Sequence, residues 1–148
     1  SIPDFGAAAD DGFLAVEVKK LAQLKKAFLM VSGAAVQKLM MRIEEEQEIM
    51  MFLADILIEI YVAESTLLRT MKLASQKGES AVNLEKNATI LYLHLATEKI
   101  AFSARQALQS FATGDELKMM MMGLKRFTKQ EPVNVTQLRR EIVKALSV

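Results

Sequence analysis

Two carboxylates lie one helical turn apart in an otherwise apolar stretch, LADILIEIYVAESTLLR, which covers residues 53–69. Asp55 and Glu59 are four residues apart, so on a helix their side chains share one face. Such a pair could hold a metal ion or divide the roles of acid and base in catalysis. His94 and Glu98 have the same spacing, and all four residues together could form a carboxylate metal site.

A di-iron carboxylate bundle requires a stricter pattern, in which two helices each supply Glu-x-x-His and two others each supply a glutamate. The chain has one histidine, and the residue three before it is Leu91, so this motif is absent. The acids can instead belong to a polar stripe that faces solvent or the basic residues of another helix. The stripe comprises Glu48, Asp55, Glu59, Thr66 and Arg69. We favour the stripe, and therefore predict neither metal ligands nor catalytic residues in this chain.

Other catalytic and cofactor-binding patterns are missing from the sequence. It contains no Gly-x-Gly-x-x-Gly, no Walker loop, no nucleophile elbow and no Ser-His-Asp arrangement. The six glycines are too scattered to build a loop that cradles phosphate. The complete lack of cysteine removes disulfides and thiolate chemistry, and it is compatible with a reducing compartment, so we expect a cytoplasmic protein.

A run of four methionines is unusual even in a chain that contains ten. It consists of Met119, Met120, Met121 and Met122. Flexible thioethers could form an adaptable surface for a partner helix. We favour the alternative, in which some of them face the core and the others lie at an interface inside a larger protein. Lys125, Arg126 and Lys129 follow, and a helix with apolar and basic faces could also lie on an anionic membrane surface.

The composition is that of one folded domain. Hydrophobic residues make up 51% of the 148 residues and charged residues 25%, far from the composition of disordered chains. The net charge of +1 gives no reason to expect a nucleic-acid partner. The most apolar run, residues 49–63, is short and is interrupted by two acids, so it does not predict a membrane-spanning helix.

Helical periodicity covers most of the chain. Between residues 13 and 41 apolar side chains recur every three or four residues, at Val18, Leu21, Leu24, Phe28, Val31, Ala35 and Leu39. We expect a break near Arg42 to Glu45 and a second long helix that ends at Lys77, with Gly78 as a left-handed cap. In residues 81–111 apolar side chains again have helical spacing, at Leu84, Ala88, Leu91, Leu95, Phe102, Leu108 and Phe111.

Two shorter helices are expected after residue 111. Asp115 can cap a helix that ends before Pro132, and either Asn134 or Thr136 can cap a last helix through Leu146. The fold class is therefore all-α, an up-down bundle of three long antiparallel helices plus one or two short C-terminal helices. Residues 1–12 are predicted to be a flexible linker and residues 13–148 a single bundle domain. The start on Ser1 rather than methionine suits a piece of a longer protein.

The segment EEEQEIMMFLADILIEIYVAESTLLRTMKLA, residues 44–74, resembles the C-terminal helical domain of the very-long-chain branch of the acyl-CoA dehydrogenase family. Gln47, the triplet Leu53-Ala54-Asp55, and Tyr61 match residues that recur in a similar helix of that branch. The likeness extends over roughly residues 13–111. It implies that Asp55 has a structural role, either as a cap or in a pair with a basic residue.

The resemblance also implies a function for the parent protein. Enzymes of this family oxidise an acyl-CoA to the trans-2-enoyl-CoA with a glutamate base and FAD, and those parts lie upstream of the matched region. The chain would then be a non-catalytic domain of a fatty-acid β-oxidation enzyme that packs on the catalytic body and supports a homo-oligomer, with FAD held elsewhere. In the family, a basic segment just before this domain has been linked to the membrane. The corresponding segment here, SIPDFGAAADDG, is acidic and short, so it does not match that basic segment. Structural or interface candidates are Gln47, Asp55, Glu59, Tyr61, Met119, Met120, Met121 and Met122.

A free-standing helical module for protein–protein interaction is the competing interpretation. In that case the four methionines would bind a partner helix directly.

Overall fold

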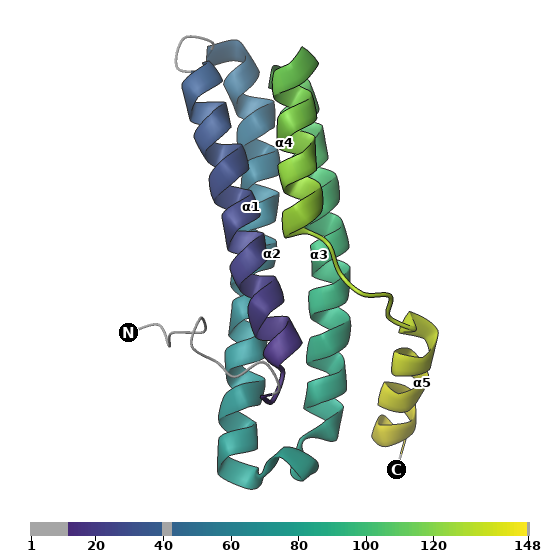
Figure 1. The fold of residues 1–148 in the computed structure, drawn as a ribbon. Coiled ribbons are helices and arrows are strands. Elements are labelled where there is room, and N and C mark those ends of the chain that lie inside the picture. Colours follow the sequence, from purple (N-terminus) through teal and green to yellow (C-terminus); the bar gives the residue numbers. More distant parts are fainter. Residues whose placement is uncertain (1–11, 40–42, 148) are drawn as a thin grey trace.

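The computed structural model describes residues 12–39 and 43–147, apart from the side chains of residues 43–46, and this part of the chain contains only helices and connections (Figure 1). The elements are α1 (Ala15–Leu39), α2 (Ile43–Lys77), the short 3-10 helix η2 (Glu79–Ala81), α3 (Asn83–Phe111), α4 (Gly114–Phe127) and α5 (Val135–Leu146). The predicted all-α class is confirmed. No described helix is both long enough and apolar enough to cross a membrane.

The helices α1 to α4 run alternately in opposite directions along a common axis, and α5 runs in the same direction as α4 (Figure 1). The three long helices α1, α2 and α3 pack on one another, and α4 folds back onto α1 and α3. Because α4 has 14 residues and α3 has 29, α4 covers only one end of the groove between α1 and α3. The helix α5 contacts the other half of α3 from outside. This arrangement confirms the predicted bundle.

The helix α1 buries the face that its apolar periodicity predicts. Six of the seven predicted positions are buried, and the seventh, Phe28, is half-buried against the core. From α2 the core receives Ile49, Leu53, Ile56, Ile60, Ala63 and Leu67. The contact between α2 and α3 also contains a polar pair, because the buried hydroxyls of Thr70 and Thr89 lie 2.7 Å apart.

The helix α3 buries a different face from the one that its large apolar residues suggest. Of the positions singled out in the sequence only Leu108 is buried, and Phe102 is exposed. The buried face is rich in small side chains, and comprises Thr89, Leu93, Ala96, Thr97, Ile100, Ala101, Ala104, Ala107 and Leu108. Small residues allow neighbouring helices to approach closely, so van der Waals contacts compensate for the smaller apolar area.

Helix ends agree with the sequence in part. The prediction that Gly78 ends α2 is confirmed, but its φ of 92° and ψ of 147° fall in a region reached by glycine rather than in the left-handed helical region. Asp115 is not the cap of α4, since the helix begins at Gly114 with Thr113 as its N-cap residue. The Asn134 side chain does cap α5, accepting a hydrogen bond from the Gln137 amide at 3.0 Å. The predicted linker, apart from Gly12, and Arg42 in the predicted break lie outside the described residues.

Candidate functional site

The two acids of α2 have different surroundings. Asp55 is exposed, whereas Glu59 is half-buried at the contact with α3. The Tyr92 hydroxyl donates a hydrogen bond of 2.9 Å to Glu59 Oε2, and Lys99 Nζ lies 3.8 Å from Glu59 Oε1. The polar stripe therefore meets a basic residue of the neighbouring helix, as the structural interpretation predicts.

Tyr92 titrates far from its ordinary range because of this contact. Burial disfavours the phenolate, and the hydrogen bond to Glu59 and the negative charge of that carboxylate act in the same direction. Together they raise the pKa of Tyr92 to about 12. Tyr92 is consequently a neutral donor that holds α3 against α2, and it is unsuited to act as a base near neutral pH.

Of the remaining candidates for a metal site, Glu98 has another partner, whereas the buried Nδ1 atom of the His94 imidazole has no hydrogen-bond partner among the described residues. The Glu98 Oε1 atom accepts a hydrogen bond of 2.9 Å from the Gln130 side-chain amide, and the same amide lies 3.2 Å from the His94 carbonyl. Within the described part of the chain, no three His, Asp or Glu side chains are grouped so that they could hold a metal ion.

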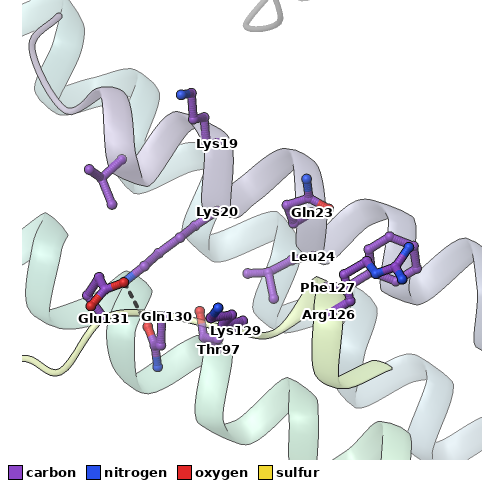
Figure 2. Close-up of a pocket in the computed structure, with 11 residues that line it drawn as sticks. Lys19, Lys20, Gln23, Leu24, Thr97, Arg126, Phe127, Lys129, Gln130 and Glu131 are labelled. Carbon is purple, nitrogen blue, oxygen red and sulfur yellow. Dashed lines mark hydrogen bonds between the residues drawn. The ribbon is translucent and has the colours of Figure 1, made fainter. Parts of the chain in front are cut away.

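A basic pocket lies where α4 ends and leaves the groove between α1 and α3 uncovered (Figure 2). Its volume is about 310 Å³. The helix α1 supplies Lys19, Lys20 and Gln23, and the end of α4 and the following connection supply Arg126, Phe127, Lys129, Gln130 and Glu131. Four cations and one acid line it, so its walls could attract an anion.

The cation at the centre of this pocket is already engaged within the protein. Lys20 extends across the pocket and donates a hydrogen bond of 2.7 Å to Gln130 Oε1 (Figure 2). Burial lowers the pKa of Lys20, although the carboxylates of Glu17 and Glu98 act in the opposite direction. Gln130 thereby joins Lys20 of α1 to Glu98 of α3, and the network fastens the α4–α5 connection to the bundle.

Sequence reasoning did not find this network. Lys20 and Gln130 are 110 residues apart, and neither belongs to a recognisable motif. The one available signal was a lysine placed close to the apolar face of an amphipathic helix, where its stem becomes half-buried.

The side of α2 that faces away from α1 and α3 is apolar and exposed. We call it the α2 outer face, and it consists of Met50, Met51, Ala54, Leu57, Ile58, Tyr61 and Val62. Tyr61 is 72% exposed, and Gln47 is exposed one turn before the face begins. All three polar residues of the sequence match, Gln47, Asp55 and Tyr61, thus lie on the outside of the domain.

The four methionines divide into two pairs. Met120 and Met121 pack against the core, while Met119 and Met122 are exposed. Two of the four methionines thus contribute to the core, and an interface role for the run stays a prediction.

Comparison with known proteins gives consistent results. Residues 23–126 match the family model described as acyl-CoA dehydrogenase, C-terminal domain. The chain is 35% identical over 130 residues to a protein of Bacillus subtilis (strain 168) described as a probable acyl-CoA dehydrogenase. It is also similar, with a TM-score of 0.88 and 33% identity, to the crystal structure of an acyl-CoA dehydrogenase complexed with FAD from Bacillus anthracis.

The lengths of these relatives differ greatly from that of the chain. The matches cover 88% and 92% of the chain, but only 22% of the Bacillus subtilis protein and 23% of the Bacillus anthracis chain. The chain thus spans less than a quarter of the relatives that it matches.

Proposed function

Because the chain belongs to the acyl-CoA dehydrogenase C-terminal domain family, we propose that it is the non-catalytic helical domain of a longer, FAD-dependent acyl-CoA dehydrogenase. In this proposal the domain packs on the catalytic body of its own chain and supports a homo-oligomer. The match at Gln47, Asp55 and Tyr61 further supports the very-long-chain branch, and the lack of cysteine supports a cytoplasmic location.

The observation that carries the proposal is the combination of similarity with length. The chain aligns over nearly its whole length with less than a quarter of each relative, and the Bacillus anthracis relative contains FAD. A similarity of this extent, at 33% identity, indicates a common domain rather than a common fold alone.

The residues of this chain do not fit a flavin themselves. The basic pocket lacks a glycine-rich loop whose backbone amides could receive a pyrophosphate, and its central Lys20 is hydrogen-bonded to Gln130. The proposal therefore assigns FAD and the catalytic base to the remainder of the parent chain. Among the described residues, Glu59 and Tyr92 contact each other and Glu59 also lies near Lys99, so the proposal assigns neither of them the role of general base.

The test is to isolate the native protein from its source cells with an antibody raised against this domain. We expect a polypeptide several times heavier than 16.5 kDa, a flavin absorption spectrum, and reduction of that flavin by acyl-CoA substrates. A native species near 16.5 kDa without flavin would overturn the proposal. That result would leave an interaction module as the better function, because Met119 and Met122 are then available to a partner.

A further inference from the structure

We propose that the α2 outer face is the surface through which this domain contacts the rest of its own polypeptide. This inference rests on the proposed function, since it requires a longer parent chain. It specifies which helix and which residues make the contact with the rest of the parent chain, and which kinds of side chain the partner surface should present.

The first observation is that α2 is apolar on two opposite sides. Its inner side buries Ile49, Ile56 and Leu67 against α1 and α3, as expected for a bundle helix. Its outer face presents seven exposed residues from Met50 to Val62, and none of the seven is charged. A surface helix normally places polar residues on the outside, and a helix that is apolar all round is normally buried.

The second observation is that the apolar surface continues onto α1. Leu29 is 67% exposed, and Val36 lies two turns further along the same side of α1. Between the two helices runs a groove of about 470 Å³, lined mainly by Phe28, Leu29, Leu57, Ile60 and Tyr61. The ion pair of Lys25 and Glu64 lies at this groove, and Asp55 lies at the opposite edge of the face, beside α3.

The rim and the centre of this surface indicate the chemistry of the partner. An apolar centre with charged residues at its edges is the usual anatomy of a protein–protein contact. The occupant should therefore present apolar side chains to Leu57, Ile58 and Tyr61. A basic side chain should lie beside Asp55, whose carboxylate is exposed.

The size of the surface favours a contact within one chain over an independent dimer. From Met50 to Val62 the helix rises about 18 Å, and two neighbouring helices are about 20 Å wide. The patch is therefore on the order of 400 Å², which suits an interface between domains of one chain. A stable complex between separate molecules usually buries about 800 Å² on each partner.

The covalent link between the domain and the rest of the parent polypeptide also favours a contact within one chain. In the relatives, more than three quarters of the polypeptide lies outside the region that this chain matches. A covalently linked body is present at an effective concentration in the millimolar range, so it covers an apolar patch before free molecules do.

The experiment uses the intact flavoprotein with the photo-reactive residue p-benzoylphenylalanine in place of Leu57 or Tyr61. We expect irradiation to give cross-links to peptides outside the 148 residues, at the mass of a single chain. The matched control carries the same group in place of Val16, which is 58% exposed but lines the basic pocket on another side of α1. Its yield of such cross-links should be at least five times lower.

Three results would overturn the inference. They are cross-links at twice the chain mass, which indicate a second copy, cross-links to another protein, and the absence of any cross-link. The mass and flavin content of the unmodified protein are measured first. A flavin-containing long chain without the expected cross-links removes only the assignment of this face, whereas a short chain without flavin removes the proposed function as well.

A charge substitution provides a second measurement that does not depend on photochemistry. In the intact flavoprotein, Ile58→Glu should weaken the contact and increase the rate at which trypsin separates the domain by about tenfold. Val16→Glu is the control and should change that rate by less than twofold. Because both residues are exposed, both variants should keep their helical circular dichroism, and equal cleavage rates would contradict the proposal.

Discussion

Glu59 and Tyr92 join two helices through a contact whose strength depends on one proton. The neutral phenol donates to the carboxylate, and the nearby Lys99 compensates part of the negative charge. A phenolate at this position would face Glu59 with a second negative charge. The contact is therefore strong only while Tyr92 keeps its proton.

This dependence gives a prediction at alkaline pH. Folding raises the pKa of Tyr92 from 10.0 to about 12, so its contribution to stability is complete below pH 10 and is lost as the pH rises toward 12. Tyr92→Phe should lower the free energy of unfolding by about 1 kcal/mol at pH 8. Urea unfolding should show that this difference from the unchanged chain shrinks between pH 10 and 12.

The other tyrosine offers a matched control for that measurement. Tyr61→Phe removes a hydroxyl from an exposed side chain and should change the free energy of unfolding by less than about 0.5 kcal/mol. A pH-independent effect of Tyr92→Phe would show that the Tyr92 hydroxyl does not act through its proton.

At the scale of the elements, the α4–α5 connection depends on Gln130. This side chain bridges Lys20 and Glu98, and no residue of α5 is buried. The helix α5 is otherwise held by its contact with α3, including an amide of Asn87 at 3.5 Å from Glu141. The loss of Gln130 should therefore loosen both the connection and α5.

We expect Gln130→Ala to speed amide hydrogen exchange in residues 128–146 by about tenfold, which corresponds to about 1.4 kcal/mol. Exchange in the buried parts of α2 and α3 should change little. Gln137→Ala is the control, because its side chain bonds to the exposed Glu141 of the same helix and its backbone amide still binds the Asn134 cap. Equal effects of the two substitutions would contradict an anchoring role for Gln130.

Elements differ in how well their packing could be predicted from the sequence. The core face of α1 was evident because apolar residues at steps of three or four, from Val18 to Leu39, follow one side of the helix. The core face of α3 was not, since alanine and threonine carry little hydrophobic signal and become buried only when a neighbouring helix approaches closely. The Lys20–Gln130 bond could not be predicted either, because it depends on where a short α4 ends.

For the whole molecule, the order and directions of the long helices were easier to predict from the sequence than which residues of each helix are buried and which are exposed. Short connections and helical periodicity were sufficient for the up-down bundle. The exposed residues of the α2 outer face were visible as an excess of apolar residues, but the sequence alone could not separate them from the core residues of the same helix. That separation required the position of α2 between α1 and α3.

The packing of α4 against α1 and α3 also predicts an order in which the helices dock during folding. The contacts of α1 with α2 and of α2 with α3 join neighbours in sequence, whereas Lys38 and Glu116, whose charged atoms are 2.9 Å apart, join α1 to α4 across the chain. Contacts between distant segments form late, because they require the closure of a long loop. Although α4 also packs on its sequence neighbour α3, its contact with α1 should therefore form after α1, α2 and α3 have assembled.

Stopped-flow kinetics can check this order with two equivalent truncations. Leu124 of α4 and Leu93 of α3 are both buried, and replacement of either by alanine should cost about 2–5 kcal/mol. Leu124→Ala should act almost entirely by accelerating unfolding, while Leu93→Ala should also slow folding. Similar slowing of folding by both would contradict late docking. The short helix α4 should therefore have little effect on the rate at which the domain folds, and a large effect on the lifetime of the folded state, which is set by the rate of unfolding.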